Sequence, residues 1–206
     1  ILSEDLDSKN IKKNLTNIDG VIVAPGFGER GVEGKISAIK HVRENNIPFF
    51  GICLGMQCAC IEFSRNVLKN KNAHSTEFDK NTPYPVIDLM EGQKTIKNKG
   101  GTMRLGSYNC SLEKGSLVYK TYKSNEIKER HRHRYEFNNS FKKEFNGNGM
   151  VTSGVNKKLN LVEVIELKNH PWFIGTQYHP EYRSRVLKPH PLFISFVKKI
   201  KSIKNG

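Results

Sequence analysis

Long apolar runs are missing from this chain of 206 residues, and none approaches the roughly 18 consecutive apolar residues of a membrane-spanning helix. The first residues, Ile-Leu-Ser-Glu-Asp-Leu-Asp, are acidic where a secretory signal would be basic. Cysteine is scarce, and no CxxC pair or zinc-like histidine pattern occurs among Cys53, Cys58, Cys60 and Cys110. We therefore expect reduced thiols, no metal site and a cytoplasmic protein that does not contact membranes.

Acidic residues are outnumbered, 20 against 34 lysines and arginines, which gives a formal net charge of +14. A basic surface attracts phosphate backbones, so nucleic acid is one candidate partner. The lysines are scattered along the chain, however, which is typical of an ordinary solvated surface. We expect anionic nucleotides, rather than nucleic acid, to benefit from the positive field.

Strand-like and helix-like segments alternate in the first third of the chain. Residues 20–24 and 48–52 are predicted to be buried strands, and residues 35–43 and 56–68 helices. The short links between them indicate parallel strands, and hence an α/β fold with a mostly parallel central sheet flanked by helices. The polar stretch 69–99 surrounds one apolar segment, 84–90. Further strands are predicted at 102–105, 135–138, 161–167 and 172–177, and an amphipathic helix at 192–203.

The motif Gly-Ile-Cys-Leu-Gly-Met-Gln occupies residues 51–57, where an apolar strand gives way to a helix. It has the form of a nucleophile elbow, with glycines two residues before and after Cys53 that let neighbouring backbone pass closely. The helix N-terminus would lower the pKa of the thiol, and the amide of Leu54 could face a developing oxyanion. The alternative for Cys53 is a buried core cysteine, which is the better interpretation of Cys58 and Cys60.

A cysteine nucleophile needs a base and a group that orients the base. The motif Gly-Thr-Gln-Tyr-His-Pro-Glu at 175–181 supplies both, with His179 as the base and Glu181 as its orienter. Residues two apart in an extended segment project to the same side, and Pro180 stiffens the link between them.

The order of these motifs resembles that of the class I glutamine amidotransferases. Within that family the chain is similar, along nearly its whole length, to the amidotransferase domain of the CTP synthases. The similarity implies one flavodoxin-like α/β domain over residues 1–206. The further blocks that carry it are Gly-Phe-Gly-Glu-Arg-Gly-Val-Glu-Gly-Lys at 26–35, Glu-Phe-Ser-Arg-Asn at 62–66, Ser-Thr-Glu-Phe at 75–78, Gly-Gly-Thr-Met-Arg-Leu-Gly at 100–106 and Glu-Arg-His-Arg-His-Arg-Tyr-Glu at 129–136.

The resemblance implies hydrolysis of L-glutamine through a γ-glutamyl thioester on Cys53, with His179 transferring protons and Glu181 holding it. It points to Phe27, Gln57, Glu77 and Arg134 as glutamine-binding residues. Physically, a carboxylate such as Glu77 can hold the α-ammonium, and the guanidinium of Arg134 can grip the α-carboxylate. No metal or cofactor is expected in this domain.

By the same resemblance, the ammonia passes to a synthase domain that uses ATP and Mg²⁺ to phosphorylate UTP and aminate it to CTP, with GTP as activator. That domain is expected to be absent from these residues, since no Walker-type phosphate loop occurs. The family's amidotransferase domain also normally opens with a strand and a helix ahead of the position of Ile1, and we expect these to be absent too.

One departure concerns the oxyanion loop, where the family usually has Pro-Gly-Gly-Phe-Gly. Here the sequence is Ala-Pro-Gly-Phe-Gly, so Pro25 replaces the first glycine. Proline has no N–H to donate. We expect the N–H groups of Gly26 and Leu54 to form the oxyanion hole, while Pro25 only fixes the turn.

Two other functions fit parts of the sequence. One is another cysteine hydrolase of this fold, such as a γ-glutamyl peptidase, which the blocks at 100–106 and 129–136 argue against. The other is a basic nucleic-acid-binding module without activity, because Arg-His-Arg-His-Arg at 130–134 could form a basic patch or a histidine-rich metal site. In a strand, alternation would place the arginines on one face and His131 and His133 on the other.

Overall fold

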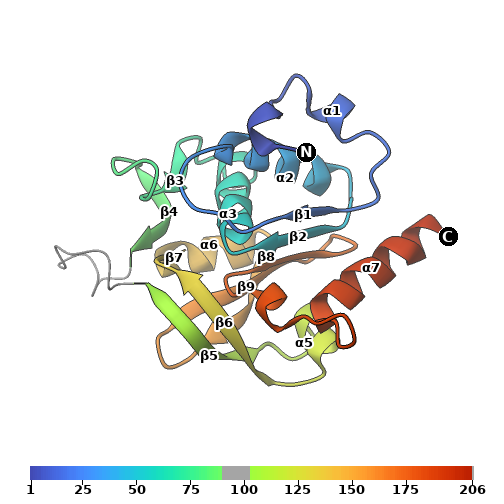
Figure 1. Cartoon of the computed structure of the whole chain (residues 1–206). Coiled ribbons are helices and arrows are strands. Elements are labelled where there is room, and N and C mark those ends of the chain that lie inside the picture. The colour runs from blue at the N-terminus through green and yellow to red at the C-terminus, as the bar shows by residue number, and fades with distance from the viewer. Residues whose placement is uncertain (90–102, 206) are drawn as a thin grey trace.

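The computed structural model describes residues 1–89 and 103–205. A seven-stranded sheet runs through its centre, and a three-stranded sheet lies beside one end of it (Figure 1). In order across the larger sheet, the strands are β1 (Val21–Val23), β2 (Phe49–Ile52), β10 (Phe173–Thr176), β9 (Leu161–Leu167), β8 (Met150–Asn156), β5 (Arg104–Leu112) and β6 (Glu126–His133). The smaller sheet contains β3 (Ala73–Ser75), β4 (Tyr84–Leu89) and β7 (Tyr135–Phe137).

The larger sheet is parallel at one side and antiparallel at the other. Strand β2 pairs in parallel with both β1 and β10. The pairs β10–β9, β9–β8, β8–β5 and β5–β6 are antiparallel. The predicted α/β fold with flanking helices is therefore present. Strands β1 and β2 are the parallel pair that the strand–helix–strand alternation predicted, and β10, from the last third of the chain, joins β2 as a further parallel strand.

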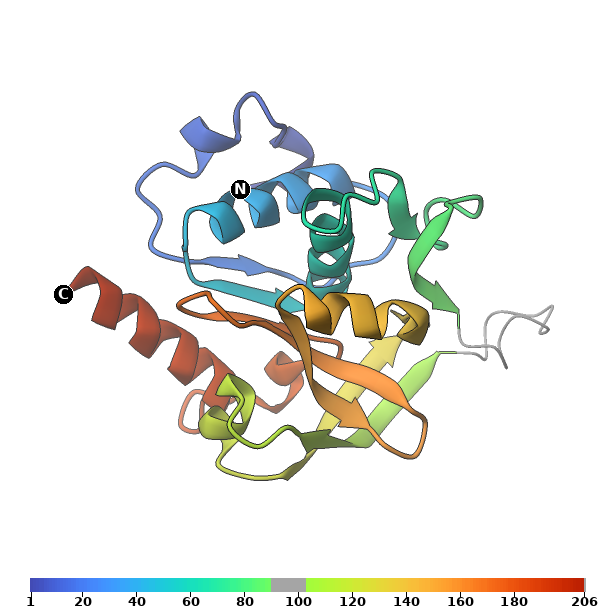
Figure 2. The ribbon, with the colours of Figure 1, turned by 180° about the vertical axis from the view of Figure 1, so that it is seen from behind.

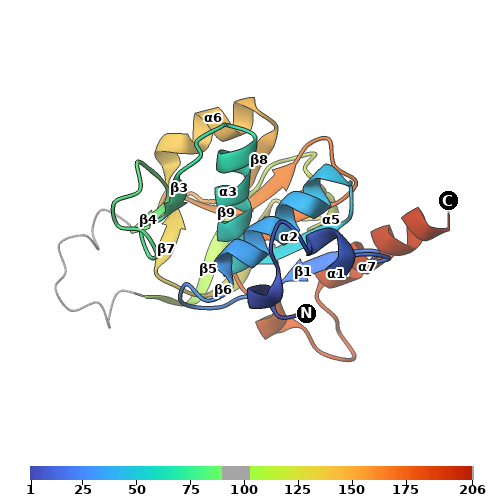
Figure 3. The same cartoon turned by 90° about the horizontal axis from the view of Figure 1, so that it is seen from above.

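Helices cover both faces of this sheet. On one face lie α2 (Val32–Glu44) and α3 (Leu54–Asn66), and on the other α5 (Leu117–Tyr122) and α7 (Pro191–Lys204) (Figure 1, Figure 2). Seen from above, α2 and α3 lie over the strands (Figure 3). The remaining helical elements are α1 (Ile11–Asn14), α6 (Lys142–Gly147), η1 (Ser3–Asp5), η3 (Asn139–Phe141) and η4 (Pro180–Arg183). Within the described ranges, no helix is long and apolar enough to cross a membrane.

Alternation along the central strands builds the two apolar cores. Phe49 of β2 and Phe173 of β10 point into the core beneath α2 and α3, where their rings lie 4.3 Å apart. Their neighbours Phe50 and Ile174 point into the core beneath α5 and α7. Successive side chains of a strand face opposite sides, so a strand that is apolar throughout can fill both cores.

The two helices of the first face follow different patterns. Helix α2 begins after Gly31, whose φ of +70° suits glycine, and buries Val32, Ile36, Ile39 and Val42 on one stripe. Every residue of α3 from Leu54 to Ser64 is buried, because this helix packs on the large sheet and also contacts α2 and the smaller sheet. All four cysteines are free and buried.

Several predicted elements match those observed. The predicted strand 161–167 coincides with β9, and β1, β2, β7, β10, α2, α3 and α7 lie within a few residues of their predicted positions. Strand β4 falls in the apolar segment 84–90, of which Met90 lies outside the described residues, as does Thr102 of the predicted strand 102–105. That strand continues to Leu112, and the elements that were not predicted include β3, β6, β8, α1, α5 and α6.

Candidate active site

Cys53 occupies the sharp turn between β2 and α3. Its φ of +52° and ψ of −103° are strained for a residue with a side chain. Hydrogen bonds hold this geometry: the Cys53 N–H donates to the carbonyl of Thr176 at 2.7 Å, and the Gln57 N–H donates to the carbonyl of Cys53 at 3.1 Å. This strand–turn–helix arrangement is that of a nucleophile elbow.

The two glycines of the motif are required by close backbone contacts. A Cβ on Gly51 would lie 2.8 Å from the carbonyl carbon and oxygen of Gly55. A Cβ on Gly55 would lie 2.3 Å from the carbonyl oxygen of Val23, in β1. Glycine at both positions therefore allows β2 to turn tightly into α3 and α3 to start directly against β1.

The electrostatic setting of the Cys53 thiol differs from the sequence-based expectation. The residue is 3% exposed, and burial raises its pKa to about 12. The Leu54 N–H lowers this pKa, as expected for the first amide of a helix, but the nearby carboxylates of Glu136 and Glu181 raise it further. The prediction of a lowered thiol pKa was wrong, because desolvation outweighs the helix terminus, and the thiol keeps its proton in this state.

His179 follows β10 and lies in contact with Glu181. Its backbone N–H donates to the carbonyl of Arg130 in β6 at 2.8 Å, and its Nδ1 is 2.6 Å from Glu181 Oε1. Its ring stacks on that of Tyr182, with centroids 4.6 Å apart and planes 4° from parallel. A carboxylate only accepts, so Nδ1 carries the hydrogen and Nε2 keeps its lone pair. Among the described residues Nε2 has no hydrogen-bond partner, so it is free to accept a proton.

Three of the residues predicted to bind glutamine lie near Cys53. The Gly28 N–H donates to the half-buried Glu77; burial raises the pKa of Glu77, while that N–H and the nearby Arg134 lower it. The buried Gln57 donates from Nε2 to the carbonyl of Tyr135 at 3.0 Å. Glu77 and Arg134 thus lie close enough to each other to interact electrostatically.

The loop before α2 brings the remaining predicted residues to the elbow. A Cβ on Gly26 would lie 3.2 Å from Leu54 Cδ2, so the backbone after Pro25 runs along the first residue of α3. Phe27 is 57% exposed, with the guanidinium of Arg132 5.6 Å from its ring centroid. A cavity of about 790 Å³ lies elsewhere, bordered by α5, α6, β8 and β9, and includes none of these residues.

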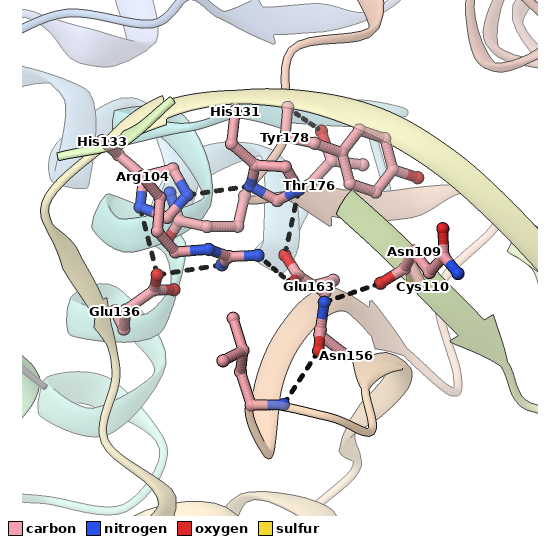
Figure 4. A network of polar contacts seen from close by, with 12 residues as sticks. Arg104, Asn109, Cys110, His131, His133, Glu136, Asn156, Glu163, Thr176 and Tyr178 are labelled. Atoms are coloured by element: carbon pink, nitrogen blue, oxygen red, sulfur yellow. Dashed lines mark hydrogen bonds and ion pairs between the residues drawn. The ribbon is translucent and has the colours of Figure 1, made fainter. Parts of the chain in front are cut away.

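Beside the elbow lies a buried ionic cluster that the sequence did not reveal (Figure 4). Arg104 donates from Nη1 to Glu136 at 2.9 Å and from Nη2 to Glu163 at 2.8 Å. His131 and His133 complete it, with His131 Nδ1 2.9 Å from His133 Nε2. As alternation predicted, the histidines and arginines of this strand lie on opposite faces, and the structure shows that the histidines are buried while Arg130 and Arg132 are exposed.

The protons of this cluster can be traced from a backbone carbonyl, which only accepts. His133 Nδ1 must donate to the Tyr135 carbonyl at 3.1 Å, so His133 Nε2 accepts from His131 Nδ1. His131 Nε2 is then an acceptor, and it faces Glu163 Oε2 at 3.5 Å. A proton on Glu163 would be shared with that nitrogen.

The pKa values of the cluster agree with neutral His131 and His133 rings. Two buried carboxyls share one guanidinium, so burial raises the pKa of Glu163 and brings that of Glu136 to about 8. Burial and Arg104 lower the pKa of His131 and bring that of His133 to about 3, which keeps both rings neutral. Across residues 1–89 and 103–205, no group of three or more His, Cys, Asp or Glu side chains is arranged to hold a metal ion.

Comparison with known proteins agrees with this geometry. The family model for glutamine amidotransferase class-I matches residues 2–199. The chain is 61% identical over 205 residues to the CTP synthase of Chloroherpeton thalassium and 59% identical over 198 residues to that of Christiangramia forsetii. It spans 37% and 36% of the lengths of these two relatives, and 98% and 96% of the chain is covered.

Solved structures show the same fold. The glutaminase domain of Trypanosoma brucei CTPS, with bound acivicin, superposes with a TM-score of 0.91 at 38% identity, covering 97% of this chain and 78% of that one. A Thermoplasma acidophilum protein described as a component of GMP synthase has a TM-score of 0.64 at 18% identity, covering 98% of this chain and 80% of that one, and shows the fold alone. The chain belongs to the class I glutamine amidotransferase family.

Proposed function

We propose that this chain is the glutaminase domain of a CTP synthase, which hydrolyses L-glutamine to glutamate and ammonia. The observation that carries the proposal is a strained elbow cysteine, Cys53, hydrogen-bonded through its backbone to the strand end that leads to the His179–Glu181 pair. The similarity to CTP synthases and to the Trypanosoma brucei glutaminase domain supports the choice of substrate.

In the proposed reaction, the Cys53 sulfur attacks the side-chain amide carbon of glutamine. Because burial raises the thiol pKa, the proton moves to His179 Nε2 as the carbon–sulfur bond forms, rather than beforehand. The Leu54 and Gly26 N–H groups hold the tetrahedral oxyanion. His179 then returns the proton to the amide nitrogen, the carbon–nitrogen bond breaks, and ammonia and a γ-glutamyl thioester result.

The thioester is cleaved by the same groups in reverse roles. His179 Nε2 takes a proton from water, whose oxygen attacks the thioester carbonyl. The carbon–sulfur bond breaks, the sulfur regains the proton, and glutamate leaves. Glu181, 2.6 Å from Nδ1, stabilises the imidazolium in both halves. The proposed steps use only protein groups, glutamine and water.

Substrate binding in this proposal uses the residues around the elbow. Glu77 holds the α-ammonium and Arg134 the α-carboxylate, while Gln57 contributes its amide oxygen because its nitrogen is bonded internally. Phe27 closes the loop side of the site. Cys53 and His179 are 3% and 2% exposed, so glutamine reaches them only when a neighbouring segment moves. We assign that movement to the 24–31 loop.

The relatives are longer than this chain, which leaves room for a second domain that could use the ammonia. We propose that residues 1–206 form one amidotransferase domain, and that the family's first strand and helix and its synthase domain lie outside them. The synthase domain of the same polypeptide would use ATP and Mg²⁺ to phosphorylate UTP and aminate it to CTP, with GTP as activator, in the cytoplasm.

The test is labelling with the glutamine analogue 6-diazo-5-oxo-norleucine, followed by peptide mass spectrometry. The analogue alkylates a thiol with loss of N₂, and we expect one adduct, on Cys53, that excess glutamine prevents and that Cys53→Ala lacks. Release of ammonia from glutamine, but not from γ-glutamyl peptides, is expected in parallel. No adduct on the folded protein, or a preference for γ-glutamyl peptides, would overturn the proposal.

A further inference from the structure

Resting on the proposed function, we infer that Gln177 is a further catalytic residue, whose side-chain N–H stabilises negative charge on the Cys53 sulfur. Gln177 directly follows β10, two residues before His179, and is 0% exposed. Its Nε2 lies 3.7 Å from Cys53 Sγ, within hydrogen-bonding distance for sulfur. Its backbone N–H is fixed by the carbonyl of Glu163 at 2.9 Å, so the side chain starts from a rigid position.

The orientation of the Gln177 amide follows from its partners. The carbonyl of Tyr135 only accepts, so the Gln57 atom 3.0 Å from it must be the amide nitrogen. That nitrogen also lies 3.2 Å from one of the two terminal amide atoms of Gln177. Because the nitrogen donates, this atom must be the oxygen Oε1. The Gln177 nitrogen is left facing the sulfur, and the N–H donor is directed at Cys53 by a chain of bonds that ends on the backbone.

The sulfur needs such a donor because its surroundings oppose charge. Burial raises the pKa of Cys53, and the carboxylates of Glu136, Glu181 and Glu77 raise it further. The Leu54 N–H is one donor that acts against them. Gln177 supplies a second donor from the strand side of the turn. Because its amide is neutral, it does not form ion pairs with the nearby carboxylates.

Gln177 would act at two moments of the proposed reaction. When the Cys53 proton moves to His179 Nε2, negative charge develops on the sulfur before the carbon–sulfur bond is complete. When water cleaves the thioester, the departing sulfur carries that charge again until His179 returns the proton. A donor fixed beside the sulfur stabilises both states more than the neutral thiol, because hydrogen bonds to charged acceptors are the stronger ones.

The test measures the sulfur without requiring glutamine turnover. Iodoacetamide alkylation of Cys53 is followed against pH by peptide mass spectrometry in the wild type, Gln177→Met and Gln177→Glu. We expect Gln177→Met to lower the alkylation rate at a given pH about 10-fold and to move the pH midpoint upward. Gln177→Glu removes the donor and adds a carboxylate, so its shift is expected to be larger.

Two controls separate this effect from damage to the fold. Asn156→Leu removes another buried side-chain amide, at the end of β8, which donates to the Asn109 carbonyl and accepts from the Leu159 N–H, and it should leave the Cys53 midpoint unchanged. Cys58, Cys60 and Cys110 are 0% exposed, so their alkylation in any sample reports unfolding.

The outcomes distinguish this inference from the proposed function. A folded Gln177→Met protein with the wild-type rate and midpoint would overturn the role of Gln177, even if the wild type hydrolyses glutamine. A shifted midpoint in Gln177→Met, together with a wild type that never hydrolyses glutamine, would keep the sulfur contact and reject the glutaminase function. We expect both the shifted midpoint and a glutaminase kcat about 10-fold or more below that of the wild type.

Discussion

The parallel and antiparallel sides of the large sheet are built on different principles. Around β1, β2 and β10 the core is apolar, and its tightest contacts are backbone against backbone at Gly51 and Gly55. Around β5, β6 and β9 a guanidinium, two carboxyls and two imidazoles are buried together. The candidate site lies where the two meet, since Cys53 comes from the first side and the carbonyl that fixes His179 from the second.

The difference indicates that the parallel side sets the geometry of Cys53 and the antiparallel side sets its electrostatic surroundings. Close-packed backbone surrounds the strained turn at Cys53, because Gly51 packs against Gly55 and Gly55 packs against Val23 of β1. The buried charges set the electrostatic field, because Glu136 belongs to the ionic cluster and also acts on the Cys53 thiol. Substitutions on the parallel side should therefore change stability by altering side-chain volume. Substitutions on the antiparallel side should change stability by altering buried charge, and their effects should depend on pH.

The largest effect is expected from Arg104→Met, which leaves Glu136 and Glu163 buried without their cation. Breaking a buried ion pair from one partner typically costs about 3–5 kcal/mol. We expect a loss of that size in the free energy of unfolding, measured by urea denaturation at pH 7.5. The matched variant is Lys204→Met, whose pair with Asp19 is exposed on α7 and should contribute less than about 1 kcal/mol. Equal effects at the two positions would contradict a structural role for the cluster.

A smaller loss is expected on the parallel side from Gly55→Ala. The added methyl would lie 2.3 Å from the Val23 carbonyl oxygen, so β1 must shift away from α3. Overpacking of this kind costs about 1–3 kcal/mol, and the shift should also reduce labelling of Cys53 by the glutamine analogue. Gly147→Ala in α6, where a Cβ meets nothing within 4 Å, is the control and should not destabilise. If Gly55→Ala lowered the free energy of unfolding no more than Gly147→Ala does, the proposed role of close backbone packing on the parallel side would be wrong.

The same two sides differ in how far the sequence predicts them. Strands β1 and β2 and helices α2 and α3 were predicted because their buried residues are apolar and follow strand or helix periods. Strand β6 buries Glu129, His131 and His133, which by composition belong on a surface. Their partners Arg104 and Glu163 come from distant parts of the chain, so no local pattern could identify this core.

The candidate site shows a similar division. Cys53, His179 and Glu181 stand out because their motifs need specific residues at short spacing. The raised thiol pKa could not be predicted, since it depends on burial created by the whole fold. Gln177 was within a recognised motif, but its role depends on which amide atom faces the sulfur, and that is set by Gln57 and a carbonyl in β7.

The ionic cluster also predicts a pH dependence, which is a smaller effect. Burial raises the folded-state pKa of Glu163 and Glu136, the latter to about 8, whereas the unfolded carboxyls stay near 4.5. Between these values the unfolded chain releases a proton that the folded protein holds, so this contribution to stability is full below pH 4.5 and is lost as the pH rises. In Glu163→Gln the amide can still accept from Arg104 and donate to His131, without ionising.

We expect the stability of Glu163→Gln, relative to the wild type, to rise between pH 5 and pH 8, because burial raises the pKa of the wild-type carboxyl, whose contribution is lost over this range, and the amide does not ionise. Urea denaturation at several pH values measures it. Glu136→Gln should lower stability at pH 5, by weakening its bond to Arg104, yet show a relative rise of the same sign with pH. Parallel pH profiles for all three proteins would mean that the cluster holds no extra proton.

The smallest effect concerns Tyr182, whose ring lies flat against His179 on the loop that leaves the parallel side. Such a stack fixes the plane of the imidazole, and in the proposed reaction it faces an imidazolium, to which an aromatic face is attracted by about 0.5–1 kcal/mol at exposed sites. We expect Tyr182→Leu to lower the glutaminase kcat by about 3- to 5-fold with KM unchanged. Tyr182→Phe keeps the ring and should keep the rate. A change confined to KM would instead place the ring against glutamine, and the proton transfer would then depend on Glu181 alone to orient His179.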